Sequence, residues 1–240
     1  MELREYKGVL HRKGNRTDRN MINDCRNNYE DFRFFPGSVV VDFGANIGGF
    51  AHMCKNENVD EYIGYEADPE NFEILAKNFP SDKGIIHKAA VSHLNDETLT
   101  FYRTPTDQGT CSGSVTPNYR SKKRRTLRYE VTNYNIDKVL DEHRPTHLKM
   151  DIEGTEAHWL EQNNGILPKY IEEFALELHN KSNVYKFMEM WYNNIMKDFK
   201  IVRARADYGF ENDNFWEFPE LEIAGSGSLF GVDIFMRRRK

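Results

Sequence analysis

The sequence predicts an α/β fold in which a mostly parallel sheet carries helices on both faces. Two observations predict it. From residue 38 onward, apolar strand-like runs alternate with amphipathic, helix-like segments, an order that is typical of parallel strands joined by helical crossovers. Near the end of the chain, two strand-like runs follow each other with no helix between them, which favours an antiparallel pair.

Three strands and two helices are expected in the first half of this pattern. Residues 39–41 are all β-branched and have no polar face, which indicates a strand buried on both sides. A later segment has Pro69 in its first turn and apolar residues at helical spacing, as amphipathic helices do. The expected strands span 38–43, 61–67 and 84–92, and the expected helices span 47–57 and 68–79.

The alternation breaks between about 97 and 131. Two strands are expected there, at 98–103 and 126–134, and we expect them to pair with each other. The segment between them, 104–125, is rich in Thr, Ser, Gly and Pro, and a connection of this length usually covers a site. We interpret it as a lid in which Ser112, Ser114 and Tyr119 bond to an acceptor; the alternative is a plain surface loop.

The rest of the chain continues the pattern on both sides of this break. Helices are expected at 135–143, 155–163 and 183–199, and strands at 145–154, 170–179, 200–207 and 228–238, the last two antiparallel. Residues 1–37 are polar and mixed, and we expect a helical or irregular cap that docks through Phe32, Phe34 and Phe35. The predicted organisation is an N-terminal cap, 1–37, and one domain, 38–240.

Composition predicts a cytoplasmic protein with no membrane span. No apolar run approaches the roughly 20 residues that cross a bilayer, the N-terminal segment lacks a secretory signal, and the three scattered cysteines are typical of reduced thiols. A net charge of −5 argues against binding along a nucleic-acid backbone. Two basic runs, 122–125 and 237–240, are interpreted as solvated surface; if the first contacts substrate, the acceptor is anionic. The oligomeric state is not specified.

The segment VVVDFGANIGGF carries the first chemical signal. Asp42 ends the strand, and Gly44, Ala45, Asn46 and Gly48 form the turn into the next helix. Glycines let a ligand approach the main chain, and a helix N-terminus offers unpaired N–H groups. The turn lacks the Lys-Ser/Thr of a phosphate-binding loop, and Asn46 replaces the second glycine of the dinucleotide pattern. Because Asp42 repels phosphate, the turn favours a ligand with a cationic amino group.

Glu66 ends the next strand and gives the second signal. An acid at this place typically accepts hydrogen bonds from the ribose hydroxyls of a nucleoside. A ribose, an amino group and close main-chain contact together describe S-adenosylmethionine. The alternative is that Asp42 and Glu66 are ordinary strand-end acids beside a tight turn, but their order and spacing favour the cofactor.

Five segments resemble motifs of class I S-adenosylmethionine-dependent methyltransferases, and more narrowly of the FkbM-type family. They are FPGSVVVDFGANIGGFA, YIGYEADPENFEIL, KAAVS, HLKMDIEGTEAHWL and LELH, within roughly 35–180. The first is common to many methyltransferases, whereas the fourth contains the more characteristic K-x-D-x-E-G-x-E. Many members of the family have Glu-Pro where this chain has Glu66 and Ala67.

The resemblance implies a Rossmann-like, seven-stranded sheet with an antiparallel last strand. It implies S-adenosylmethionine as the cofactor, with Ala67, Asp68 and Ala90 in the cofactor site beside the residues named above. It also implies O-methyl transfer to a hydroxyl of a sugar, a glycan, a nucleotide sugar or another small molecule.

Methyl transfer to a hydroxyl needs alignment and a proton acceptor. The fourth strand of the parallel sheet delivers Lys149, Asp151 and Glu153 to its carboxyl end, and the fifth delivers Glu177 and His179. The resemblance favours Asp151 as the base, although histidine ordinarily titrates nearer neutrality. Alternatively, Asp151 binds the amino group of the cofactor and His179 takes the proton. Lys149 pairs with a carboxylate or, if its pKa is depressed, serves as the base.

Asp151, Glu177 and His179 also offer ligands for a divalent ion. Their spacing is not a metal signature, so the sequence favours a reaction without metal. Glu153 and Glu156 equally suit the start of a helix, whose dipole they would stabilise.

Two other functions stay open. An RNA or DNA methyltransferase is opposed by the acidic charge balance and by the lack of an N/D-P-P-Y/F motif. A non-catalytic, cofactor-binding partner subunit is opposed by the intact acids at Asp151, Glu153 and Glu177.

Overall fold

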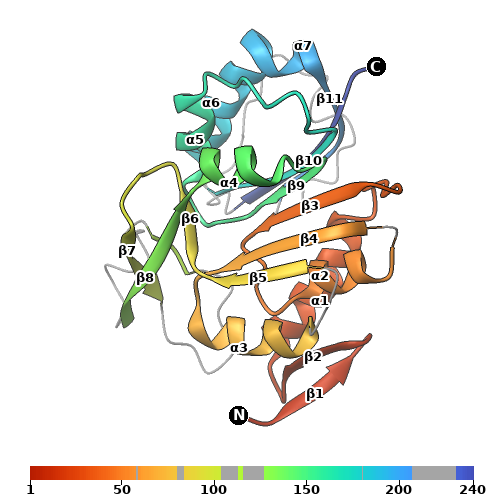
Figure 1. The fold of residues 1–240 in the computed structure, drawn as a ribbon, viewed down its shortest axis with the longest axis vertical. Coiled ribbons are helices and arrows are strands. Elements are labelled where there is room, and N and C mark those ends of the chain that lie inside the picture. Colours follow the sequence, from red (N-terminus) through yellow and green to blue (C-terminus); the bar gives the residue numbers. More distant parts are fainter. Residues whose placement is uncertain (58, 80–83, 104–112, 116–126, 180, 207–230) are drawn as a thin grey trace.

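A seven-stranded sheet lies at the centre of the protein (Figure 1). The computed structural model describes residues 1–57, 59–79, 84–103, 113–115, 127–179, 181–206 and 231–240. The strand order is β11-β12-β10-β9-β3-β4-β5. The strands are β3 (Ser38–Phe43), β4 (Val59–Glu66), β5 (Gly84–Lys88), β9 (His147–Met150), β10 (Glu173–His179), β11 (Phe199–Ala206) and β12 (Gly231–Arg238). β12 is antiparallel to both of its neighbours, whereas the pairs among β10, β9, β3, β4 and β5 are parallel. The predicted Rossmann-like sheet with an antiparallel last strand is confirmed.

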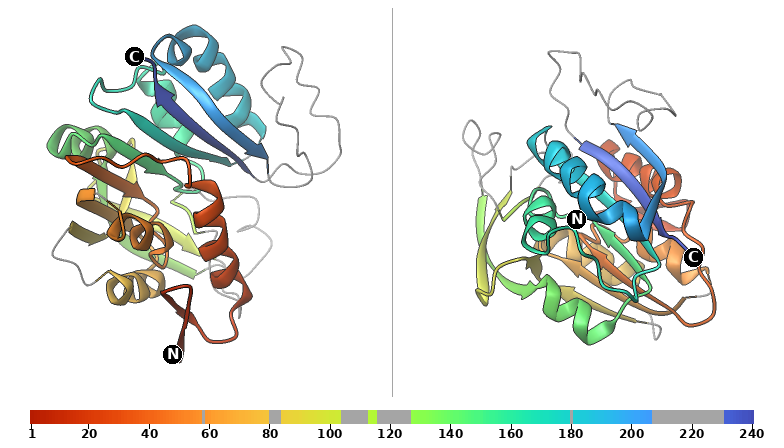
Figure 2. Two further views of the ribbon diagram at one scale, coloured as in Figure 1. Left: turned by 90° about the vertical axis from the view of Figure 1, so that its right-hand side faces the viewer. Right: turned by 90° about the horizontal axis from the view of Figure 1, so that it is seen from above.

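Helices cover both faces of this sheet (Figure 2). One group is α1 (Arg16–Asn28), α2 (Gly49–Lys55) and α3 (Pro69–Asn78); the other is α4 (Ile136–His143), α5 (Glu156–Gln162), α6 (Lys181–Met190), a π-helical turn (Trp191–Ile195) and α7 (Met196–Asp198). Because side chains alternate along a strand, Val40 packs toward the first group and Val41 toward the second. Within the described residues, no helix combines the length and the apolar character needed to cross a bilayer.

The strand predicted at 84–92 is two strands in the structure. β5 ends at Lys88, and β6 (Ala90–Ser92) leaves the main sheet to pair with β8 (Leu127–Asn135) in a smaller sheet that also contains β7 (Thr98–Arg103). The Ser92 hydroxyl donates to the Asn133 side chain and helps to fix this new pairing. A continuous strand-like run does not reveal such a change of partner. The predicted pairing of the two strands in this region is correct, since β7 and β8 are antiparallel.

The N-terminal segment contains a hairpin that the sequence did not predict. β1 (Leu3–Tyr6) and β2 (Val9–Arg12) pair through a turn in which Lys7 and Gly8 both have positive φ. The Asn78 side chain bonds to both main-chain groups of Leu10 and so ties the hairpin to α3.

The predicted docking of the N-terminal segment through phenylalanines holds in part. Phe32 is buried and Phe34 partly so. Phe35, in contrast, is 41% exposed, because successive side chains of an extended segment point in opposite directions.

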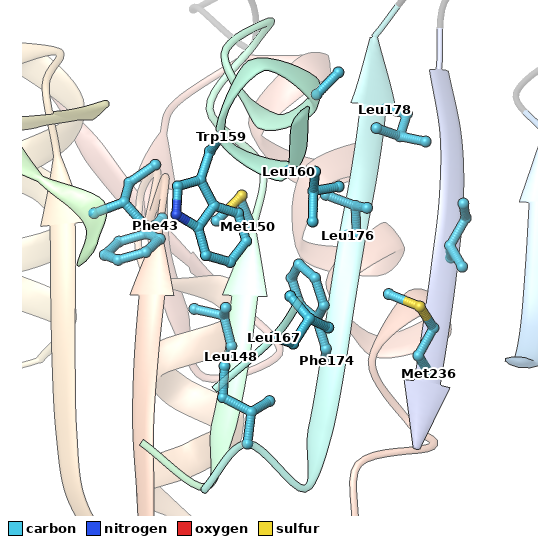
Figure 3. Packing of buried hydrophobic residues seen from close by; sticks show 14 of the residues in the cluster. Phe43, Leu148, Met150, Trp159, Leu160, Leu167, Phe174, Leu176, Leu178 and Met236 are labelled. Carbon is cyan, nitrogen blue, oxygen red and sulfur yellow. The ribbon is translucent and has the colours of Figure 1, made fainter. Parts of the chain in front are cut away.

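The largest hydrophobic cluster lies between the sheet and the second helix group (Figure 3). Trp159 of α5 is fully buried and meets Phe174 of β10 edge-on, with ring centroids 6.4 Å apart. Its indole nitrogen donates to Asp137 Oδ1 at 2.7 Å. Burying a large apolar side chain contributes about 1.5–3 kcal/mol. The cluster therefore holds β9 and β10 firmly, and these strands end at the predicted catalytic side chains.

Candidate active site

A cavity lies at the carboxyl ends of β3, β4 and β9, where parallel sheets usually bind ligands. The predicted cofactor residues that line it are Gly44, Asn46, Glu66, Ala67, Asp68, Ala90 and Asp151. Three others, Asp42, Ala45 and Gly48, are buried behind this lining. The predicted cofactor residues thus gather at one cavity, where their contact with a cofactor stays a prediction, and the structure gives several of them protein partners.

Asp42 is fully buried and its carboxylate has two protein partners. Lys149 Nζ lies 3.0 Å from Oδ1, and the Tyr62 hydroxyl donates to Oδ2 at 2.6 Å. Asp42 does not line the cavity and is already paired, so its expected place in the cofactor site stays a prediction.

Lys149 is correspondingly unavailable as a base. Its ammonium also donates to the Gly44 carbonyl at 2.8 Å. Burial lowers the pKa of Lys149, but the carboxylates of Asp42 and Asp151 outweigh burial and leave that pKa above its ordinary value. Of the two expectations for Lys149, pairing with a carboxylate is correct, and a depressed pKa is wrong.

The turn after β3 satisfies its own main-chain groups. The N–H groups of Gly44 and Ala45 both donate to the Tyr65 carbonyl, at 3.0 and 2.9 Å. The Asn46 N–H donates to Glu66, and the Asn46 side chain accepts from the Ile47 N–H. The expected unpaired N–H groups are therefore occupied. Asn46 has a φ of 52°, a conformation that asparagine tolerates because its short side chain bonds locally.

Gly44 is required by the protein itself rather than by a ligand. Its φ is +84°, and a Cβ there would lie 1.9 Å from the Asp151 carbonyl oxygen. Gly48, at φ +93°, packs against α3, where a Cβ would lie 3.0 Å from Leu75 Cδ1. The glycines thus allow the turn to approach β9 and α3 closely.

Glu66 is the carboxylate that faces the cavity from β4. Its two oxygens accept from the N–H groups of Asn46 and Asp68, at 2.7 and 2.8 Å. Burial and the nearby Asp68 carboxylate raise the pKa of Glu66 to about 8, although the two N–H donors act in the opposite direction. Each carboxylate oxygen can accept more than one hydrogen bond. Glu66 can therefore hold a ligand hydroxyl while keeping both protein donors.

Asp68 begins α3 and is largely committed to that helix. Its Oδ1 accepts from the N–H groups of Glu70 and Asn71, and its Oδ2 lies 3.2 Å from Arg103 Nε. Arg103 also bonds to Glu70 at 2.6 Å. These contacts join α3 to β7 and fix one wall of the cavity.

His179 of β10 stands among four carboxylates. Its Nε2 lies 3.3 Å from Glu153, 3.3 Å from Glu177 and 3.7 Å from Asp151. Its Nδ1 lies 3.3 Å from Glu156 Oε1. The structure thus brings together the predicted catalytic residues other than Lys149, and it brings together the three predicted metal ligands. We call Asp151, Glu153, Glu177 and His179 the acceptor cluster.

Glu156 is the functional neighbour whose contact with His179 the sequence did not reveal. Its side chain is fully buried, and it accepts from the N–H groups of Ile152 and Gly154, at 2.9 and 2.8 Å. Its place in the fourth motif is a signal, although an acid at the start of a helix gives the same pattern. The structure shows that it also fixes the orientation of the His179 imidazole.

The acceptor cluster holds an excess of negative charge in a poorly solvated place. Burial and Glu177 raise the pKa of Asp151 to about 7. Burial, helped by Asp151 and Glu177, raises the pKa of Glu153 to about 8. For His179, burial lowers the pKa, but the surrounding carboxylates outweigh it and raise the pKa above the ordinary value.

Part of the predicted lid contacts this site. Gly113 and Val115 line the cavity, and the Ser114 hydroxyl donates to the Glu153 carbonyl at 2.6 Å. Ser114 also pairs with the main chain of Tyr102. Ser112, Tyr119 and the basic run 122–125 lie outside the described residues, so their expected contacts with an acceptor stay predictions.

The sequence identifies the class of this protein. The model of the family described as "Methyltransferase FkbM domain" matches residues 42–197, more than half of the chain. The chain therefore belongs to the FkbM methyltransferase family and is a methyltransferase that depends on S-adenosylmethionine. A search of curated proteins gives no significant match.

Solved structures show a distant likeness. The precorrin-6y C5,15-methyltransferase of Geobacter metallireducens is 11% identical, with a TM-score of 0.49, and the alignment covers 98% of this chain and 100% of that one. The M. jannaschii protein TYW2, solved in complex with AdoMet, is 12% identical, with a TM-score of 0.44 and coverage of 99% and 86%. At such identities and scores, neither likeness bears on the acceptor of this chain.

Proposed function

We propose that this protein transfers the methyl group of S-adenosylmethionine to a hydroxyl of a sugar, a glycan or another small molecule. The observation that carries the proposal is the position of Asp151. It lines the cavity, and its Oδ1 lies 3.7 Å from His179 Nε2. Asp151 and Glu153 both line the cavity, so they join it to the acceptor cluster, whose carboxylates can receive the proton of a hydroxyl.

The cavity lining fits the cofactor. Glu66 offers lone pairs to the two ribose hydroxyls, and the small side chains of Ala67 and Ala90 leave room for a flat adenine ring. Asp42 is paired with Lys149, so we assign the counter-charge for the amino group to Asp151 instead.

The reaction is an in-line displacement at the methyl carbon, with the acceptor oxygen about 3 Å away. The oxygen–carbon bond forms as the carbon–sulfur bond breaks, and the electron pair of that bond stays on sulfur. The products are a methyl ether and S-adenosylhomocysteine. We assign the hydroxyl proton to Glu153, because Asp151 faces the amino group and His179 is held by its surrounding carboxylates.

A nucleic acid is the second candidate acceptor. A cavity of about 620 Å³ between the β1–β2 hairpin and α1 is lined by Arg4, Arg16 and Arg19, and the Arg19 guanidinium lies 4.7 Å from the centre of the Tyr6 ring. Cationic and aromatic side chains together suit phosphates and stacked bases. We favour the first candidate, because the net charge of −5 opposes binding along a nucleic-acid backbone.

The test is transfer of label from S-adenosylmethionine that carries a tritiated methyl group. Sugars, nucleotide sugars, glycans and RNA are supplied separately to the purified protein. We expect label in one of the hydroxyl-bearing small molecules or glycans, and we expect Glu153→Gln to lose most of that activity while the exposed control Glu172→Gln keeps it. Label confined to RNA would support the second candidate. No label in any fraction, despite binding of S-adenosylhomocysteine, would overturn both.

A further inference from the structure

The acceptor cluster has the dimensions of a coordination site. Three of its residues, Asp151, Glu177 and His179, each offer one ligand atom, and these three atoms lie within 4.8 Å of one another. Around a cation with bonds of about 2.1 Å in octahedral geometry, neighbouring ligand atoms are roughly 3.0 Å apart and opposite ones roughly 4.2 Å apart. The separations of His179 Nε2 from Glu177, 3.3 Å, and from Asp151, 3.7 Å, fall between these values.

The imidazole is oriented as a metal ligand would be. The Glu156 carboxylate contacts Nδ1 of His179, and this carboxylate itself accepts hydrogen bonds from two main-chain N–H groups. Nε2 is therefore the nitrogen directed at the carboxylates. Histidines that bind metals almost always donate their other ring nitrogen to a carboxylate or carbonyl, which fixes the tautomer and the ring.

The acceptor cluster also contains more acidic side chains than basic ones. Asp151, Glu153 and Glu177 lie around Nε2 of a single imidazole, which carries at most one positive charge against their three carboxylates, and their side chains are only 16, 20 and 22% exposed. Lys149, the cation of the neighbouring strand, is bound to Asp42 and to the Gly44 carbonyl. Carboxylates that are taken from water need a compensating charge nearby.

We infer that Asp151, Glu177 and His179 bind one divalent cation of the Mn²⁺ or Mg²⁺ type beside the cofactor cavity. The two carboxylates suit such ions, and three protein ligands leave positions for water and for an acceptor hydroxyl. A bound hydroxyl is more acidic, and its proton passes to Glu153, which lies outside this ligand set. This role of the ion rests on the proposed function, whereas its binding does not.

Electron paramagnetic resonance of Mn²⁺ tests the inference on the full chain without any substrate. The protein is first treated with a chelator and then titrated with Mn²⁺. We expect the signal of hydrated Mn²⁺ to fall until one equivalent is bound, and Mg²⁺ to compete. We also expect pulsed measurements to show nitrogen modulation from one imidazole. Absence of binding, or binding without nitrogen modulation, would overturn the inference.

Variants locate the ion. His179→Gln should abolish the nitrogen modulation, and Glu156→Gln should weaken Mn²⁺ binding by about 10–100-fold through loss of the orienting contact. The matched control is Glu161→Gln on α5, an exposed acid paired with Lys186, which should bind Mn²⁺ like the unmodified protein. If a variant fails to fold, the nitrogen modulation in the unmodified protein still shows whether an imidazole binds the ion.

A parallel titration with S-adenosylhomocysteine separates the two proposals. Binding of S-adenosylhomocysteine without binding of Mn²⁺ would refute the proposed ion site and leave the proposed function intact. Binding of Mn²⁺ with nitrogen modulation, but without binding of S-adenosylhomocysteine, would support the ion site and refute the proposed function.

Discussion

Lys149 Nζ lies 3.0 Å from Asp42 Oδ1, and the two residues are register partners across β3 and β9. Both side chains are buried, and the same ammonium bonds to the Gly44 carbonyl. The acid that ends the first strand of the sheet is thus an anchor for the turn. Asp151, which directly follows β9, lines the cavity instead, and so does Glu153.

The first prediction concerns this buried pair. Lys149→Met leaves the Asp42 carboxylate buried without its cation, and breaking such a pair usually costs about 3–5 kcal/mol. We expect a loss of that size in the free energy of unfolding, measured with urea. The double variant with Asp42→Asn should recover part of it. If Lys149→Met were as stable as the exposed control Lys138→Met, the anchoring role would be wrong.

A second prediction separates the two requirements for glycine at position 44. Gly44→Ala and Gly37→Ala both place alanine at a positive φ, which costs roughly 1–2 kcal/mol. Only at Gly44 does the new Cβ meet main chain, since nothing lies within 4 Å at Gly37. We expect Gly44→Ala to be the more destabilised in urea and to lose binding of S-adenosylhomocysteine. Equal stabilities for the two variants would contradict the close approach to Asp151.

The third prediction concerns the affinity for the cofactor product. Glu66→Gln removes a charged acceptor of hydrogen bonds, so binding of S-adenosylhomocysteine should weaken by about 1.5–3 kcal/mol. Ribose hydroxyls favour the ionised carboxylate, whose pKa is about 8 in the free protein. The affinity of the unmodified protein should therefore rise as the pH increases through about 8 and level off above that pH.

Calorimetry at several pH values tests this prediction. Glu66→Gln should show no such rise, whereas the exposed control Glu73→Gln should follow the unmodified protein. An unchanged affinity in Glu66→Gln would remove Glu66 from the cofactor site.

A fourth prediction concerns the pH dependence of folding stability and follows from the same raised pKa of Glu66. The pKa of Glu66 is raised from its ordinary 4.5 to about 8, so the folded state holds the proton more tightly than the unfolded state does. The contribution of Glu66 to stability is then fully present below about 4.5 and is lost as the pH rises to about 8. Relative to Glu66→Gln, the unmodified protein should become less stable across this window in urea unfolding. A constant difference would show that Glu66 is not buried in this way.

The sequence was sufficient for most of the sheet, because β-branched runs and amphipathic helices alternate clearly from residue 38 onward. It was not sufficient where strands change partners or are very short. The run 84–92 looks uniform, yet β6 leaves the main sheet after Lys88. The hairpin of β1 and β2 has strands of four residues each, too short to show a clear period.

The site was predictable in its location but not in its contacts. The motifs placed Glu66 and Asp151 at strand ends, and the carboxyl ends of parallel strands meet at one edge. A carboxylate that is paired with a buried cation does not face the cavity. The pairing of Lys149 with Asp42 joins residues far apart in the chain, and no sequence pattern reveals it. The contact of Glu156 with His179 joins α5 to β10, and such a contact emerges only when the helix is packed.

The most direct test of the account is a crystal structure of the complex with S-adenosylhomocysteine. We expect the ribose hydroxyls on Glu66, the amino group on Asp151, and the sulfur facing the acceptor cluster around His179. An amino group bound to Asp42, or a nucleoside placed away from Glu66, would contradict the account.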